Sequence, residues 1–167
     1  DNRDAETVCA ALEDRGVALL SVADSQYPAQ LLTRLGEDAP AVLFAAGSLR
    51  LLNSPSVACA GARDASERGL TLARGACRAL ANASVNVTSG YANGVDTAAH
   101  EGAVAAGGTT TIVLAEGILG FRPKTPLANH LTEQNSRIVS QFWPASRWTQ
   151  YQAMQRNRTI IGLSGAM

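Results

Sequence analysis

Arg63 lies in a short turn whose residue types suit the binding of an anion. The apolar residues 57–60 predict a buried strand, and apolar residues that recur every three or four positions after Gly69 predict a helix with Ser66 as N-cap. A strand that enters a helix N-terminus through Gly61 places free N–H groups and the positive end of the helix dipole together. The third glycine of the G-x-G-x-x-G fingerprint is absent. The turn therefore indicates a phosphate site with Arg63 as a second donor, or alternatively a tight turn with a solvated arginine.

A second turn from strand to helix, residues 88–96, carries two glycines and polar donors. Gly90 and Gly94 would let a ligand approach the backbone, while Ser89 and the neighbouring Asn93 could contact a phosphate. Ordinary turn chemistry is the alternative explanation. Two such turns in one chain are more specific than one, and we favour a phosphate site at this second turn.

Basic residues near the end of the chain offer further anion donors. Arg156 and Arg158, with Asn157 between them, could clamp phosphates at one end of a helix, or could form a solvated helix end. Lys124 lies in a loop bounded by prolines and is a weaker candidate, and Arg122 is weaker still.

Asp96 and His100 are four residues apart, so they share a helical face and could form a hydrogen bond. A carboxylate that orients an imidazole is a catalytic arrangement, but no serine or cysteine nucleophile accompanies this pair. We therefore expect a structural pair. His130 has no cysteine or carboxylate at ligand spacing, and we expect neither a metal nor a cofactor.

Trp143 and Trp148 flank Pro144 and could stack on nucleobases. Aromatic residues make up only 5% of the chain, so we expect both tryptophans to anchor the last helix in the core instead.

Alternating apolar segments predict strands and helices that follow one another along the chain. Such alternation implies β-α-β crossovers and a parallel sheet, with a binding crevice beyond the carboxyl ends of the strands. Arg63, residues 89–94 and residues 116–124 would converge there. We expect strands at residues 17–22, 41–46, 57–60, 85–89, 109–115 and 137–140, and helices at residues 5–15, 28–35, 66–82, 95–105, 127–134 and from about 149.

The 167 residues suffice for one well-cored domain, with 46% hydrophobic and only 17% charged residues. A net charge of zero does not indicate a strongly basic nucleic-acid binder, although a neutral chain can still carry a local basic groove. The cysteines have no C-x-x-C spacing and are expected to be small buried hydrophobes; they are Cys9, Cys59 and Cys77. The chain has no signal peptide pattern or apolar run of membrane-spanning length, which predicts a cytoplasmic protein.

Four motifs, in order, resemble the DprA/Smf family, the DNA-processing proteins of bacterial transformation and competence. The resemblance covers residues 27–164. The motifs are Gly61-Ala62-Arg63 with Ser66 and Gly69; residues 89–96 with Ala99-His100; Gly108-Thr109-Thr110 with Gly117; and residues 156–164.

This resemblance implies an α/β, Rossmann-like three-layer fold with a mainly parallel sheet. One extended domain would span residues 1–167, with residues 1–55 as an N-terminal extension and residues 56–167 as the core. The family resemblance further implies a non-enzymatic protein that binds and protects single-stranded DNA, loads a RecA-type recombinase, forms a homodimer and has no membrane partner. The implied phosphate-binding residues are Gly61, Arg63, Ser66, Ser89, Gly90, Asn93, Gly94, Lys124, Arg156, Asn157 and Arg158.

The sequence departs from the family pattern at several points. Ala62 replaces a serine, Gln141 replaces a glutamate, and the loop around Lys124 does not align cleanly. The family continues into another strand and a glycine-rich turn where this chain ends, so we expect a chain shortened at its C-terminus.

A nucleotide-processing enzyme is the alternative, because the LOG phosphoribohydrolases share the fold that the resemblance implies. Arg156 and a glutamate would cleave an N-glycosidic bond in such an enzyme. The glutamate motif P-G-G-x-G-T-x-x-E is absent, and Glu116 is the best-placed substitute. A nucleotide sensor also remains open.

Overall fold

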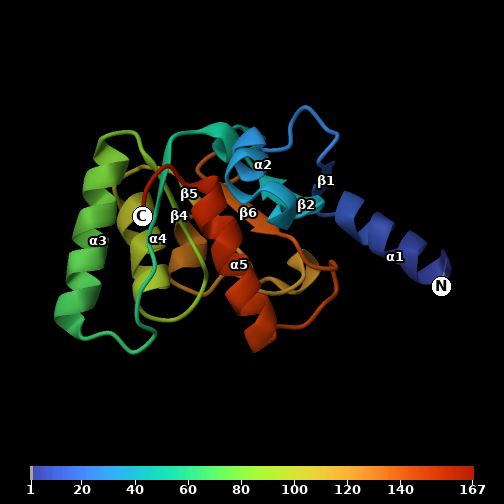
Figure 1. Cartoon of the computed structure of the whole chain (residues 1–167). Helices are drawn as coiled ribbons and strands as arrows, with labels where there is room; N and C mark the ends of the chain where they lie inside the picture. The colour runs from blue at the N-terminus through green and yellow to red at the C-terminus, as the bar shows by residue number, and fades with distance from the viewer. Residues whose placement is uncertain (1) are drawn as a thin grey trace.

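The computed structural model describes residues 2–167 and contains one six-stranded sheet between helices (Figure 1). The strands are β1 (Ala18–Ser21), β2 (Val42–Gly47), β3 (Ser56–Ala58), β4 (Asn86–Ser89), β5 (Thr110–Val113) and β6 (Ser136–Ser140). The helices are α1 (Asn2–Glu13), α2 (Ala29–Leu35), α3 (Glu67–Asn82), α4 (Val95–Ala105) and α5 (Gln150–Leu163). The predicted alternation of strands and helices is therefore confirmed.

The sheet has the strand order β1-β2-β6-β5-β4-β3. Strands β3, β4, β5 and β6 are parallel, whereas β2 runs antiparallel to both of its neighbours. An antiparallel edge on an otherwise parallel sheet is a common arrangement. The mainly parallel sheet is thus confirmed, and the carboxyl ends of four parallel strands meet at one edge.

Helices cover both faces of the sheet, which gives the predicted three layers. On one face, α2 and α5 bury a core that includes Leu31, Leu43, Val113, Val139 and Ile160. On the other face, α3 and α4 bury a second core around Cys77, Val87, Ala99 and Ala103. Small residues let α3 and α4 approach closely: a Cβ added at Gly102 would lie 2.4 Å from the carbonyl oxygen of Arg74.

Two connectors differ from expectation. No element was expected between the strands at 41–46 and 57–60, but this segment contains a 3-10 helix (Leu49–Asn53) that buries Leu51 and Leu52 against the sheet. The predicted helix 127–134 is only a 3-10 turn (Leu127–His130), because the side chains of Thr132 and Asn135 bond to each other's backbone N–H and stabilise a turn instead.

Helix α1 extends away from the body of the molecule (Figure 1), and it reaches the core through Leu12 and the partly buried Val8. Cys9 on this helix is exposed, so the prediction of a buried Cys9 is wrong, whereas Cys77 is buried as predicted and Cys59 is half-buried. None of the helices among residues 2–167 has the length and apolar character needed to cross a bilayer.

Candidate functional site

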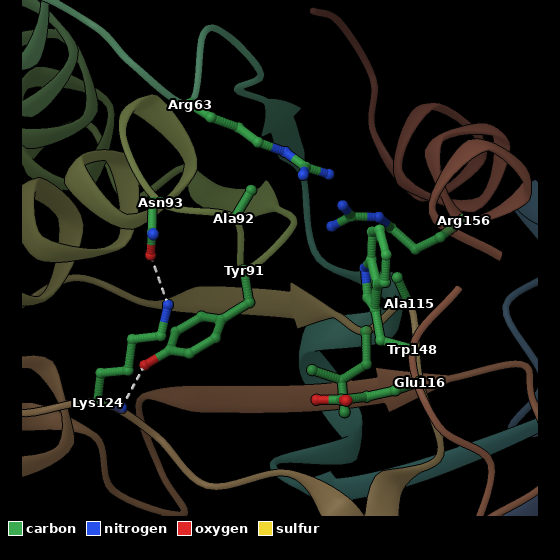
Figure 2. Close-up of a pocket in the computed structure, with 10 residues that line it drawn as sticks. Arg63, Tyr91, Ala92, Asn93, Ala115, Glu116, Lys124, Trp148 and Arg156 are labelled. Atoms are coloured by element: carbon green, nitrogen blue, oxygen red, sulfur yellow. Dashed lines mark hydrogen bonds between the residues drawn. The ribbon is translucent and has the colours of Figure 1, made fainter. Parts of the chain in front are cut away.

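The loops that follow β3, β4 and β5 meet the segment before α5 at the carboxyl edge of the parallel strands, where a cleft opens (Figure 2). This is the edge at which open α/β sheets bind ligands. Ten residues line the cleft: Arg63, Tyr91, Ala92, Asn93, Leu114, Ala115, Glu116, Lys124, Trp148 and Arg156.

A second hollow beside the first shares Arg63, Ala92, Trp148 and Arg156 with it and continues along α5 past Asn157. At the other end, Asn93 and Lys124 also line a third hollow beside α4. The three open hollows adjoin one another through these shared residues, and together we call them the groove. An open groove suits an extended ligand better than an enclosed small molecule.

The turn that carries Arg63 is held against the start of α4. The backbone N–H of Val95 donates to the carbonyl of Ala62 over 3.2 Å. Gly94 adopts a φ of +82°, and a Cβ there would lie 2.3 Å from the Ala62 carbonyl oxygen and 2.5 Å from that of Arg63. Only glycine fits this position, because both its backbone conformation and its space exclude a side chain. Gly94 therefore positions Arg63 instead of leaving room for a ligand.

Arg156 reaches the strand ends from α5 and is only 6% exposed. Its Nη1 donates to the carbonyl of Val113 over 2.9 Å and lies 3.9 Å from Oδ2 of Asp96. A Cβ added at Gly90 would lie 1.5 Å from the same Nη1. Gly90 thus makes room for the Arg156 guanidinium, whereas the sequence predicted that it makes room for the ligand itself.

The guanidinium groups of Arg63 and Arg156 point toward one another across the cleft (Figure 2). Burial lowers the pKa of Arg156, Asp96 raises it, and the positive charge of Arg63 lowers it again. Burial also raises the pKa of Asp96, while Arg156 lowers it. Among residues 2–167, Arg63 has no carboxylate partner within ion-pair distance. The cleft therefore concentrates positive charge that an anion would offset.

Lys124 lies at the opposite end of the cleft from Arg63 and Arg156 (Figure 2). Its Nζ donates to Oδ1 of Asn93 over 2.6 Å, and its backbone N–H donates to the Tyr91 hydroxyl over 2.6 Å. The ammonium lies 5.5 Å from the centre of the Tyr91 ring. The structure thus brings Lys124 and Asn93 together at the cleft with Arg63 and Arg156, as predicted for the four residues.

Two serines that were predicted to bind phosphate have other partners. Ser89 is fully buried, because β4 is covered on both faces, and its hydroxyl donates to the carbonyl of Cys59 over 2.5 Å. Ser66 accepts from the backbone N–H of Gly69 over 3.2 Å, which confirms it as the N-cap of α3, and it does not line the cleft. We correct the predicted site by removing both hydroxyls.

The predicted clamp between Arg156 and Arg158 is wrong. Two residues apart on an α-helix lie roughly 200° apart around its axis, so these side chains leave opposite sides of α5. Arg158 is exposed and forms an ion pair of 3.3 Å with Asp38, outside the groove. Asn157 lines the part of the groove beside α5, and Gly61 lines it opposite, with a Cβ excluded by the Val95 side chain.

His100 is a structural residue, as expected, but its partner is not Asp96. The buried ring bonds to Thr110 Oγ1 over 2.6 Å through Nδ1 and to the carbonyl of Gly90 over 2.5 Å through Nε2. A carbonyl can only accept, so Nε2 carries the proton. The Thr110 hydroxyl also faces the carbonyl of Val87 over 2.8 Å, so its single proton is shared between that carbonyl and Nδ1. Burial lowers the pKa of His100 to about 4, so the ring is neutral at pH 7. Asp96 faces Arg156 instead.

Both tryptophans are largely exposed, so the prediction that they anchor α5 in the core is wrong. Helix α5 is anchored in the core by Ile160 and Leu163 instead. Trp148 lines the cleft, and Arg63 lies over its ring at 5.6 Å. Tyr91, the other aromatic wall, was missed as a separate candidate, although a tyrosine between two glycines at a strand end is a detectable signal.

Comparisons with known proteins agree with one another. The family model of DNA recombination-mediator protein A matches residues 18–167. Protein Smf of Escherichia coli is 39% identical over 145 residues, which cover 85% of this chain and 38% of that protein. The DNA processing protein DprA of Streptococcus pneumoniae is 35% identical over 145 residues, covering 86% of this chain and 50% of its own length.

Solved structures give the same result. The X-ray structure of DprA from Streptococcus pneumoniae superposes with a TM-score of 0.78 at 33% identity, covering 88% of this chain and 51% of that chain. DprA from Helicobacter pylori, studied for its single-stranded DNA binding mode, superposes with a TM-score of 0.71 at 25% identity, covering 89% and 66%. The chain spans half or less of the length of the two curated relatives.

Proposed function

Since the chain belongs to the DNA recombination-mediator protein A family, we propose that it binds single-stranded DNA in the groove, through the phosphate backbone. One observation carries this proposal: the guanidinium groups of Arg63 and Arg156 converge, and Arg63 has no carboxylate partner among residues 2–167. Two like charges at close range repel, and a phosphate between them replaces that repulsion with two charge-assisted hydrogen bonds.

Lys124 supplies a third positive charge at the other end of the cleft, so successive phosphates of one strand can be held along the groove. Contacts to phosphates carry no sequence information. Binding by this mechanism has weak sequence preference, and its affinity falls as salt rises because counterions are released from the strand.

The recombination-mediator description of the family supports two further proposals about the function of the complex. The bound strand is protected and is passed to a RecA-type recombinase, and the protein acts as a homodimer. Sedimentation of the protein with oligo-dT, with and without a RecA-type recombinase, tests both: a monomer that never joins the recombinase would contradict them.

Cleavage of an N-glycosidic bond by Glu116 and Arg156 is not proposed, although both side chains line the cleft. The family is one of DNA-binding proteins, not of enzymes. Membership of this family therefore argues against a hydrolase and supports strand binding.

Fluorescence anisotropy of labelled oligo-dT tests the proposed function. Arg63→Ala is expected to weaken binding at least tenfold at low salt, since charged hydrogen bonds to phosphate are worth about 1.5–3 kcal/mol. Arg158→Ala is the matched control, because it removes the same charge from the same molecule outside the groove. Equal losses in the two variants would contradict a phosphate site at Arg63.

A further inference from the structure

Trp148 occupies an unusual place for a large apolar side chain. Its indole lines both the cleft and the hollow beside α5, so it stands where the two join, and 48% of the residue is exposed. An exposed indole buries little apolar area and contributes little to the core. The exposed part of the indole ring is therefore available for contact with a ligand in the groove.

The backbone on both sides of Trp148 is fixed. Before it, the N–H of Gly117 donates to the carbonyl of Ser146 over 2.9 Å. After it, the Thr149 hydroxyl accepts from the backbone N–H of Gln152 over 3.1 Å and caps α5. The backbone at Trp148 is therefore already ordered, and binding does not have to order this segment.

Tyr91 and Trp148 lie on opposite sides of the cleft, with the basic groups of Arg63 and Arg156 beside the space between them (Figure 2). The Tyr91 ring is held by the hydrogen bond between its hydroxyl and the N–H of Lys124, and by edge-on contact with Phe121 at 5.0 Å. A fixed phenol and an exposed indole thus enclose a slot next to two guanidinium groups. The chemistry fits a planar aromatic group attached to a phosphate.

We propose that the cleft binds a nucleobase of the strand, stacked on the indole of Trp148, beside a phosphate held by Arg63 and Arg156. This inference rests on the proposed function and extends it from the backbone to the bases. Arg63 lies 5.6 Å from the centre of the indole, so phosphate and base are received by neighbouring groups. Stacking tolerates every base because each has a π-face, so the site adds affinity without sequence selection.

The chain contains two tryptophans, which makes a direct optical test possible. Trp143 lies in a separate hollow beside α1, so Trp143→Phe leaves Trp148 as the sole indole and leaves the groove intact. In this protein, oligo-dT is expected to quench tryptophan fluorescence upon binding. An oligomer of the same length with abasic sugars is expected to bind at least about fivefold more weakly, since one stacked base contributes roughly 1 kcal/mol or more, and to cause no quenching.

Substitutions at Trp148 provide the matching evidence. Trp148→Ala is expected to weaken oligo-dT about fivefold or more while leaving the abasic oligomer unchanged, and Trp148→Phe is expected to restore part of the loss. Because the residue is exposed, thermal unfolding of both variants should match the parent protein.

The outcomes separate this inference from the proposed function. Equal binding of oligo-dT and abasic oligomer, without quenching, overturns the base site while strand binding stands. Failure of both oligomers to bind overturns the proposed function itself. Quenching by thymidine monophosphate at concentrations as low as those of oligo-dT would overturn a strand as the occupant, in favour of a free nucleotide.

Discussion

The guanidinium of Arg156 occupies the space that a side chain at Gly90 would need: a Cβ there would lie 1.5 Å from Nη1 and 2.4 Å from Oδ2 of Asp96. Gly90 belongs to the turn after β4, and Arg156 comes from the opposite face of the sheet. The glycine therefore lets α5 place a charge at the carboxyl edge of the sheet, beside Asp96 in the first turn of α4.

Gly90→Ala is expected to displace Arg156 and to weaken strand binding about as much as Arg156→Ala does, roughly tenfold at low salt. The two changes act on one interaction, so the double variant should lose little more than either single variant. Anisotropy titrations of the four proteins measure this. Additive losses would show that Gly90 contributes separately.

Glu116→Gln is expected to strengthen binding of oligo-dT several-fold at low salt. Glu116 lines the cleft, and its carboxylate repels the phosphates that Arg63, Arg156 and Lys124 attract. The gain should shrink at high salt because screening weakens the repulsion.

The same variant tests for hydrolysis. Release of free base from nucleoside monophosphates by the parent protein, lost in Glu116→Gln, would support the enzyme.

His100 makes the stability depend on acid pH. Its pKa is lowered from 6.5 to about 4, mainly by burial. Below pH 6.5 the unfolded chain therefore binds a proton that the native protein does not, and stability falls as pH falls from 6.5 to 4. The loss is roughly 2–3 kcal/mol by pH 4.5.

His100→Gln is expected to remove most of this dependence when unfolding by urea is compared at pH 7 and pH 4.5. Asp96 has the opposite effect, because its raised pKa makes the native protein bind a proton that the unfolded chain releases. Asp96 is present in both proteins, so the difference between them isolates His100. An unchanged pH dependence in the variant would contradict the assignment.

Arg137 is buried at the start of β6 without a carboxylate partner. Its Nε donates to the Ser48 carbonyl over 2.7 Å, whereas neither Nη nitrogen has a partner in the part of the chain that the structure describes. Burial lowers its pKa to about 10. Arg137→Met matches the side chain only as far as Nε and removes the buried charge, so we expect the free energy of unfolding to rise by about 1 kcal/mol or more. A loss of stability in urea titrations would contradict this.

The local motifs were predictive because they depend on near neighbours in the chain. Arg63 in its glycine turn and Lys124 in its proline-bounded loop both line the cleft as predicted. The parallel strands explain why, since their carboxyl ends meet at one edge of the sheet.

The errors concern what lies beyond the local segment. Helical spacing places Arg156 and Arg158 on opposite sides of α5. The prediction of a pair relied on both residues being arginines and did not take this spacing into account. Ser89 looked like a donor because the depth of β4 in the sheet is not visible in the sequence. The exposure of Trp148 could not be predicted either, because other residues fill the core beneath α5.

The salt dependence of oligo-dT binding tests the central claim most directly. For single strands, each phosphate contact contributes about 0.7 to the slope of log K against log salt concentration. The account predicts that Arg63→Ala lowers the magnitude of this slope by about 0.7 and that Arg158→Ala leaves it unchanged. The same slope in the parent protein and in Arg63→Ala would contradict a phosphate held between Arg63 and Arg156.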